Sequence, residues 1–189
     1  MKLWLKSFLW PLADLNSALP ATGTIIDLGC GDGLVAHHLA LHGPRRHVIG
    51  IDLNPARINQ ASAIKPKLKN LQFIAQDITR AQLNQASGCL LSDVLHHLSK
   101  PNQSRLLSHI SHQLKTGSVC VIKEADKNNL FLSSLTRLWD WLLYPQDKIS
   151  YYSATTLIKL MHQHGFSVKF KPLRHFFPGS VNLFVCTKQ

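Results

Sequence analysis

A glycine-rich turn between a short apolar run and a helical pattern constrains the fold of this 189-residue chain more than any other feature. The turn, Asp27-Leu28-Gly29-Cys30-Gly31-Asp32-Gly33, follows the apolar run Thr24–Leu28 and precedes a helical pattern that extends from Leu34 to about Leu41. Glycines let a backbone turn sharply and approach a ligand closely, where a Cβ would clash. This order predicts a βα unit whose turn lies at the ligand-binding edge of a parallel sheet.

The wider pattern extends this unit to a complete α/β domain. Apolar runs alternate with helical stretches from residue 24 to residue 123, which is typical of a parallel sheet, and two later runs, Phe166–Phe170 and Val181–Cys186, predict an antiparallel pair. We predict a single domain over residues 1–189, with a Rossmann-like, seven-stranded, mostly parallel sheet, helices on both faces and an antiparallel carboxyl-terminal strand pair. The five predicted parallel strands are 24–28, 47–51, 71–75, 88–91 and 118–122.

Capping signals delimit the predicted helices. Asn54-Pro55 places an N-cap before a proline at the first helical position, and Ser153 is a cap for a helix that ends at Gly165. Apolar residues recur at helical spacing from Pro101 to Leu114. Residues 1–22 are predicted as an amino-terminal helical segment.

The composition indicates a soluble, cytoplasmic chain. No run approaches the ~20 apolar residues of a membrane-spanning helix, and the apolar stretch Met1–Leu12 is interrupted by Lys6 and Pro11, which makes it a poor signal peptide. The four cysteines lie far apart without a Cys-x-x-Cys pair, so neither a disulfide framework nor a zinc ribbon is predicted. A reduced cytosolic compartment fits this cysteine usage.

Residues 126–152 interrupt the alternating pattern and are predicted as a lid-like insertion. Between Asn128 and Tyr144, apolar side chains gather on one arc of a helical wheel, with polar side chains opposite. The arc holds Phe131, Leu132, Leu135, Leu138, Trp139, Leu142 and Leu143, and the opposite side holds Ser133, Thr136, Arg137 and Asp140. One interpretation is a helix that covers the sheet or the active site. The other is an interfacial helix that contacts a membrane surface.

Acidic residues follow the ends of successive predicted strands and indicate the ligand class. Asp27 and Asp32 would repel a pyrophosphate at the glycine turn, and Leu34 stands where the dinucleotide fingerprint requires its last glycine. Asp52 is placed to accept both hydroxyls of a ribose, and Asp77 is placed to contact an adenine amino group. Together they describe a site for a nucleoside that carries a positive charge.

Four motifs in this order resemble class I S-adenosylmethionine-dependent methyltransferases: Asp27–Gly33, Gly50-Ile51-Asp52, Gln76-Asp77-Ile78 and Asp93-Val94-Leu95-His96-His97-Leu98. The resemblance implies that the chain is a methyltransferase with S-adenosylmethionine as its cofactor. It implies that the glycine turn holds the methionine moiety, with the first acidic residue near its ammonium group, and that the later motifs hold the ribose and the adenine. The implied cofactor-binding residues are Asp27, Gly29, Cys30, Gly31, Asp52, Leu53, Asp77, Ile78 and Asp93.

Methyl transfer requires a base only when the acceptor must lose a proton. The catalytic candidates are His96 and His97, after the fourth predicted strand, and Glu124, the only glutamate of the chain, after the fifth. A helix cap or an ion pair with Lys123 is the alternative role for Glu124. No metal site is predicted, because six further histidines are expected on solvated helix faces without a third ligand at compatible spacing: His37, His38, His109, His112, His162 and His164.

The net charge of +11 first suggests a nucleic-acid partner. The motifs do not favour one: Ser92-Asp93-Val94-Leu95 replaces the Asn/Asp-Pro-Pro-aromatic motif of base methyltransferases, and the Lys-Asp-Lys-Glu set of ribose methyltransferases is incomplete, with Asp93 and Lys123 as two members. An RNA or protein methyltransferase and a non-catalytic, cofactor-binding scaffold stay open as alternatives.

A small acceptor is the preferred prediction. Asp93–Leu98, Lys123–Asp126 and Tyr151–Phe166 resemble a subgroup of small bacterial methyltransferases that accompany fatty-acid-like or aryl polyene biosynthetic enzymes. That resemblance implies an aromatic acceptor or one linked to an acyl carrier, and an acidic carrier protein is a partner that a basic surface suits. Peripheral membrane contact is a further candidate interaction.

Overall fold

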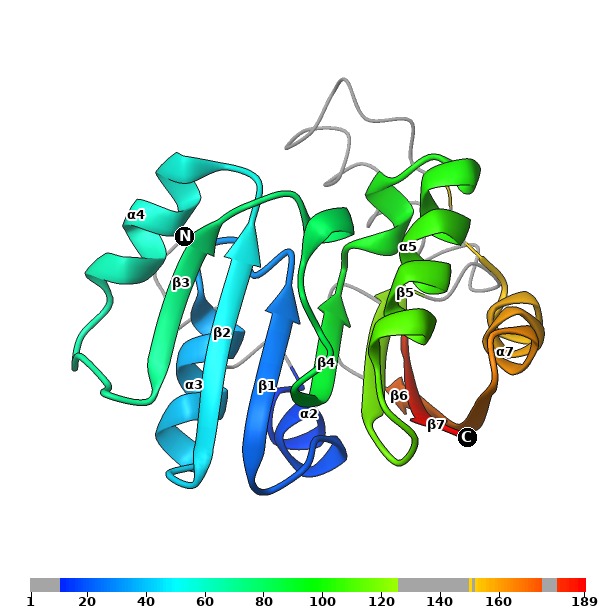
Figure 1. Cartoon of the computed structure of the whole chain (residues 1–189), viewed down its shortest axis with the longest axis horizontal. Helices are drawn as coiled ribbons and strands as arrows, with labels where there is room; N and C mark the ends of the chain where they lie inside the picture. The colour runs from blue at the N-terminus through cyan, green and yellow to red at the C-terminus, as the bar shows by residue number, and fades with distance from the viewer. Residues whose placement is uncertain (1–10, 126–149, 151, 175–179) are drawn as a thin grey trace.

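The computed structural model describes residues 11–125, 150, 152–174 and 180–189, which form a single seven-stranded sheet in the order β3-β2-β1-β4-β5-β7-β6 (Figure 1). Strands β1 to β5 are parallel, and β7 runs antiparallel to both β5 and β6. The fold class predicted from the sequence is confirmed. The strands are β1 (Gly23–Leu28), β2 (Arg46–Asp52), β3 (Leu71–Ala75), β4 (Ala86–Ser92), β5 (Val119–Ala125), β6 (Phe166–Arg174) and β7 (Ser180–Lys188).

Five helices and two 3-10 turns surround the sheet in the described part of the chain. In Figure 1, α5 lies in front of the sheet and α3 behind it, while α4 packs along β2 and β3. The elements are α2 (Leu12–Ala18), α3 (Leu34–His42), α4 (Pro55–Ala63), α5 (Lys100–Gln113), α7 (Ala154–Gln163), η1 (Ile78–Arg80) and η2 (Leu95–His97). The predicted caps are confirmed: the Asn54 side chain accepts from the Ala56 amide at 2.9 Å, and Ser153 Oγ accepts from the Thr156 amide at 3.2 Å.

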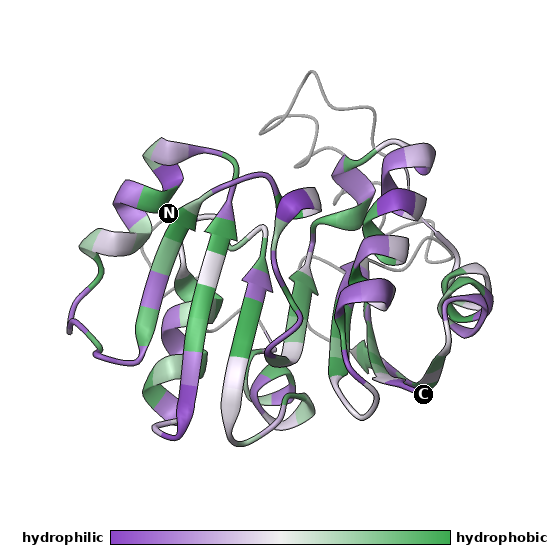
Figure 2. Cartoon of the chain, viewed as in Figure 1, coloured by the Kyte–Doolittle hydropathy of each residue, from purple (hydrophilic) through white to green (hydrophobic). Residues whose placement is uncertain are grey.

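Apolar side chains fill both faces of the sheet, because successive residues of a strand point to opposite sides. Leu91 of β4 and Ile122 of β5 pack with α5 and α7 on the face that we call the front. Leu90 and Val121, one residue earlier on each strand, pack with α2 and α3 on the back. Figure 2 shows the resulting hydrophobic strands at the centre of the molecule. This alternation decides on which side each polar residue at the strand ends lies.

Three of the four cysteines come together in the sheet although they are far apart in the sequence. Cys89, Cys120 and Cys186 are register partners on β4, β5 and β7, and all are buried and free. A hydrogen bond with the Cys120 thiol and, second to it, burial raise the pKa of Cys89. All three side chains pack in the front core.

The structure bears on two further sequence predictions, those for His37 and the amino-terminal segment. His37 was expected on a solvated face, but it is buried on α3, and its Nε2 hydrogen-bonds to the Pro66 carbonyl at 3.0 Å. The loop after α4 covers this part of α3, so the histidine is a satisfied core residue. Of the amino-terminal segment 1–22, the structure describes the helix α2, whose Leu15 packs in the back core.

The predicted insertion, residues 126–152, lies outside the described residues except for Ser150 and Tyr152. Its lid and membrane interpretations stay predictions. None of the helices in the described ranges combines the length and the apolarity that crossing a membrane requires.

Candidate active site

The glycine turn follows β1 and leaves an open space above Gly31. Gly29 has a φ of +77° and Gly31 one of +56°, backbone conformations that favour glycine. A Cβ on Gly29 would lie 2.6 Å from Val94 Cγ2, so the turn packs directly against the segment after β4. A Cβ on Gly31 would meet nothing nearer than Arg57 Nη1 at 3.8 Å. The turn therefore has one packed side and one side that a ligand can approach.

Asp52, at the end of β2, holds the turn in this shape. Its Oδ2 accepts from the Gly31 amide at 2.9 Å, and its Oδ1 accepts from the Asn54 amide at 2.9 Å. The Ile51 carbonyl accepts from the amides of the turn as well. The side chain of the next residue, Leu53, is 72% exposed at the same edge. The sequence placed Asp52 and Leu53 at the ligand edge, but it gave no sign that Asp52 also fixes the turn.

Asp77 and Ile78 follow β3 and lie beside this edge. The Asp77 carboxylate caps η1, accepting from the Thr79 amide and hydroxyl, each at 2.9 Å, and these bonds hold its pKa below the usual range. The Gln76 amide donates to the Asp52 carbonyl at 2.9 Å, which joins the ends of β2 and β3. Ile78 is half-buried against the front core.

Asp27 is the buried acid of the site. It is 2% exposed near the end of β1, and its Oδ2 has no hydrogen-bond partner among the described residues. Burial, with a smaller effect from the Asp52 charge, raises the pKa of Asp27 to about 7, against the effect of a hydrogen bond from the Ala36 amide. Burial and the charges of the same two acids also raise the pKa of the Cys30 thiol. An unpaired buried carboxylate oxygen is suited to receive a cationic group.

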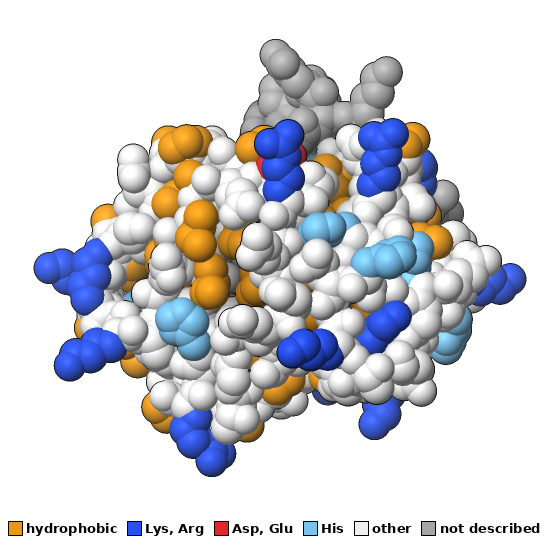
Figure 3. All heavy atoms as spheres, in the orientation of Figure 1, with side chains coloured by type: hydrophobic (Ala, Val, Ile, Leu, Met, Phe, Trp, Pro, Cys, Tyr) orange, Lys and Arg blue, Asp and Glu red, His pale blue; other side chains and the backbone are white. Residues whose placement is uncertain are grey.

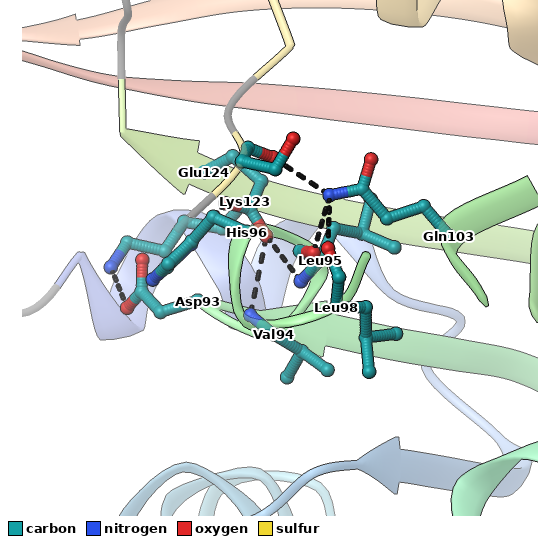
Figure 4. A network of polar contacts seen from close by, with 9 residues as sticks. Asp93, Val94, Leu95, His96, Leu98, Gln103, Lys123 and Glu124 are labelled. Carbon is teal, nitrogen blue, oxygen red and sulfur yellow. Dashed lines mark hydrogen bonds and ion pairs between the residues drawn. The ribbon is translucent and has the colours of Figure 1, made fainter. Parts of the chain in front are cut away.

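Glu124 and His96 form a hydrogen-bonded pair on the front side of the edge (Figure 4). Glu124 Oε2 lies 2.6 Å from His96 Nδ1, and both side chains are buried. Glu124 Oε1 accepts from the amides of Val94 at 3.2 Å and Leu95 at 2.8 Å. Because a carboxylate accepts, Nδ1 is the donor in this contact, and in the neutral ring the lone pair is on Nε2. The half-buried His97 ring packs on His96, with centroids 4.2 Å apart.

The alternative ion pair between Glu124 and Lys123 is not formed. Neighbouring residues of a strand point to opposite faces, and Lys123 pairs instead with the carboxylate of Asp93 on the back side. Asp93, a predicted cofactor-binding residue, has a φ of +57°, and its amide donates to the Lys123 carbonyl at 3.0 Å. In Figure 4 the Lys123 and Gln103 side chains extend to opposite sides of the η2 turn.

A small pocket opens beside the Glu124–His96 pair on the front face. Gln103 of α5 supports its wall: Nε2 donates to the carbonyls of Leu95 at 2.7 Å and Ser150 at 2.7 Å. Ser150 in turn donates its amide to the His96 carbonyl at 2.8 Å. These contacts were missed in the sequence because they join segments that are distant along the chain. The pocket is lined by Leu95, His96, Glu124, Ser150, Tyr152, Leu157, Asn182 and Phe184.

The acidic site contrasts with the basic surface. Figure 3 shows Lys and Arg side chains dispersed over one face of the molecule, with acidic side chains scarcely visible among them. Asp27, Asp52 and Glu124 are instead buried at the edge of the sheet. Within the described ranges, no cluster of three or more His, Cys, Asp or Glu side chains is arranged to hold a metal ion.

Part of this sequence is similar to curated methyltransferases. Trans-aconitate 2-methyltransferase of Deinococcus radiodurans is 32% identical over 116 residues, 60% of this chain and 43% of that protein. Malonyl-[acyl-carrier protein] O-methyltransferase of Bacillus anthracis is 33% identical over 69 residues, 36% of this chain and 25% of that protein. The chain thus spans less than half the length of these curated relatives.

The fold is also that of solved methyltransferases. An O-methyltransferase family 2 protein from Planctomyces limnophilus, in complex with apigenin, superposes with a TM-score of 0.78 at 18% identity, covering 99% of this chain and 60% of that one. A family model described as a methyltransferase domain matches residues 5–169. The chain therefore belongs to the methyltransferase domain family.

Proposed function

We propose that this chain is a S-adenosylmethionine-dependent methyltransferase that acts on a small or acyl-carrier-linked acceptor. The unobstructed side of Gly31, together with the buried carboxylates of Asp27 and Asp52 at the same edge, is the observation that carries the proposal. A nucleoside with a cationic amino-acid end suits an edge that carries two buried acids. When bound, the cofactor supplies a methyl group already activated by its sulfonium.

The residues fit such a cofactor one by one. Asp27 would receive the ammonium group, and Asp52 would receive the ribose hydroxyls with the second lone pair of each oxygen, since one is used by an amide. Leu53 presents exposed apolar surface on which adenine would pack, and Asp77 with Ile78 would border its edge. Asp93 follows β4 on the back side, and its ion pair with Lys123 joins the segment after β4 to β5.

His96 is the residue that we propose as the general base, with Glu124 as its orienting partner. The Glu124 carboxylate holds the proton on Nδ1, so Nε2 would take a proton from an acceptor hydroxyl. The same carboxylate would stabilise the imidazolium that results. Glu124 is therefore a positioning residue, because its oxygens contact His96 and two backbone amides.

The front pocket supports the acceptor class. Tyr152, Leu157 and Phe184 line it with apolar side chains, and Asn182 with His96 adds polar groups, the mixed lining that small-molecule sites share. Two relatives are named for acids, trans-aconitate and a malonyl group on acyl carrier protein. An acidic carrier protein is the macromolecular partner that the excess of exposed Lys and Arg favours. A cytoplasmic location fits the four buried, free cysteines.

Titration calorimetry with S-adenosylmethionine tests the cofactor assignment. We expect the Asp52→Asn variant to bind at least about tenfold more weakly, because it loses a charged acceptor. Asp14→Asn is the matched control, since Asp14 lies on α2 in an ion pair with Lys171 outside the site. Folded wild-type protein that does not bind, or undiminished binding by Asp52→Asn, would reject the proposal.

Transfer of a labelled methyl group to phenols, trans-aconitate and malonyl-acyl carrier protein tests the base. For a phenolic acceptor we expect His96→Gln to lower kcat about 10²–10⁴-fold and His97→Gln to change it little. A carboxylate acceptor has no proton to lose at neutral pH, so its kcat should be much less sensitive to His96→Gln. Equal effects of the two histidine variants on phenol methylation would contradict the assignment.

A further inference from the structure

Three polar side chains continue the back layer of the sheet at the ligand edge. Two residues beyond the core residues Ile25, Leu90 and Val121, the strands carry Asp27, Ser92 and Lys123. Residues two apart on a strand point to the same face, so all three side chains lie on the back. Each is at least nine-tenths buried, with exposures of 2%, 9% and 5%.

Two of these residues have polar atoms that the described chain does not satisfy. Neither Asp27 Oδ2 nor Ser92 Oγ has a hydrogen-bond partner among the described residues. Ser118 directly precedes β5 at the opposite end of the sheet and is buried to a similar extent. Its hydroxyl donates to the Ala86 carbonyl at 3.1 Å. A buried hydroxyl without a partner destabilises a protein. Its presence at the ligand edge indicates that a ligand supplies the missing bond.

The charges beside Ser92 indicate which group that ligand presents. Ser92 and Lys123 are register partners on β4 and β5, and the Lys123 ammonium is bonded to the carboxylate of Asp93, the residue that follows Ser92. An ammonium has three N–H donors, so it can hold a second carboxylate together with that of Asp93. A serine hydroxyl is a further donor to the same group. On the other side, Asp27 offers only acceptor oxygens once it is ionised.

We propose that Ser92 and Lys123 bind the carboxylate at the amino-acid end of the cofactor, next to Asp27, which receives the ammonium. The proposal rests on the proposed function, because it specifies part of the same site. A zwitterionic end group adds no net charge to this buried edge, and it gives both unsatisfied atoms a partner. An acceptor carboxylate would meet the same donors, so the test is made without an acceptor.

Calorimetric titration with two nucleosides distinguishes binding of the amino-acid end from binding of the rest of the cofactor. S-adenosylhomocysteine carries the amino-acid end, and 5′-methylthioadenosine lacks it. We expect Ser92→Ala to bind S-adenosylhomocysteine about tenfold more weakly and to bind 5′-methylthioadenosine as wild type does. Lys123→Gln should show the same selective loss, and Ser92→Ala decides the question if Lys123→Gln does not fold.

Thermal unfolding without ligand distinguishes a binding role from a structural one. Ser92→Ala removes an unsatisfied hydroxyl, so its unfolding temperature should equal or exceed that of wild type. The matched control, Ser118→Ala, loses a formed hydrogen bond and should unfold at a lower temperature while binding S-adenosylhomocysteine normally.

Either of two results overturns the proposal: unchanged binding of S-adenosylhomocysteine by Ser92→Ala, or equal losses for both nucleosides. In the first case the hydroxyl contributes nothing to cofactor binding, and in the second its effect is not confined to the amino-acid end. If folded wild-type protein binds neither nucleoside, it is the proposed function that fails.

Discussion

The two sides of the ligand edge differ in how well their buried polar atoms are satisfied. On the front, Glu124 accepts from two backbone amides and from His96. On the back, Asp27 Oδ2 and Ser92 Oγ have no partner among the described residues. A satisfied network fixes its geometry before a ligand arrives, whereas unsatisfied atoms destabilise the ligand-free protein and are relieved on binding. The front should therefore contribute stability and the back should contribute affinity.

Removal of the Glu124 carboxylate should have the largest effect on stability. Glu124→Ala leaves two amides and His96 Nδ1 without their acceptor in a buried environment, and we expect it to lower the free energy of unfolding by about 3–5 kcal/mol. Urea denaturation measures this loss. The control, Asp14→Asn, breaks an ion pair with the exposed Lys171 and should lie within about 1 kcal/mol of wild type. A loss as small as that of the control would show that the front network is not structural.

Neutralising Asp27 should change stability in the opposite direction, so that the free energy of unfolding rises at pH 8. Its pKa is about 7 in the folded chain, so as pH rises from about 4 to 7 the unfolded chain releases this proton first and stability falls. Asp27→Asn lacks this titration. At pH 8 it should be more stable than wild type by on the order of 4 kcal/mol, and near pH 4 it should be equal. Urea denaturation at both pH values measures the difference, and a variant less stable at pH 8 would mean that the carboxylate is structurally required.

Ionisation of Asp27, which lowers stability, should strengthen the binding of S-adenosylhomocysteine. An ionised Asp27 attracts the ammonium group, so calorimetry should give binding about tenfold weaker at pH 6 than at pH 8 for a pKa of about 7. Asp27→Asn should bind weakly at both pH values. 5′-Methylthioadenosine has no ammonium group and should bind with little pH dependence. If the affinities for both nucleosides changed equally with pH, the titrating group would not be Asp27.

The fold, and the meeting of acidic residues at one edge of the sheet, were predictable because their signals are local. Central strands of a parallel sheet are buried on both faces, so each appears as a continuous apolar run, and the five runs between residues 24 and 123 all form strands. Asp27, Asp52 and Asp77 were predicted to lie at one edge because the ends of parallel strands meet there, and the structure places all three at that edge. The antiparallel pairing of β6 and β7 was also predicted, although both strands extend further than their apolar runs.

The front side was less predictable because its contacts are long-range. A strand buried on both faces gives no sign of which face Lys123 or Glu124 occupies, so the sequence left their mutual ion pair open. Gln103 contacts Ser150, far along the chain, and Asn182 reaches the pocket from β7. Likewise, no spacing rule indicates that Cys89, Cys120 and Cys186 are neighbours, because only the strand order brings them together.

The smallest effect should come from Leu53, which belongs to neither network. Its side chain is 72% exposed, so Leu53→Ala should leave the free energy of unfolding within about 0.5 kcal/mol of wild type. If adenine packs on it, the loss of apolar contact should weaken nucleoside binding about fivefold. Both nucleosides carry adenine and should be weakened equally, in contrast to Ser92→Ala.

Leu41→Ala is the control for this variant, because Leu41 is also exposed, at 49%, but lies near the end of α3 away from the turn. It should bind both nucleosides as wild type does. Selective weakening of S-adenosylhomocysteine by Leu53→Ala would place the amino-acid end, and not the adenine, against β2. In that case the cofactor would lie in the opposite orientation along the ligand edge. Asp27 would then no longer be the residue expected to receive the ammonium group.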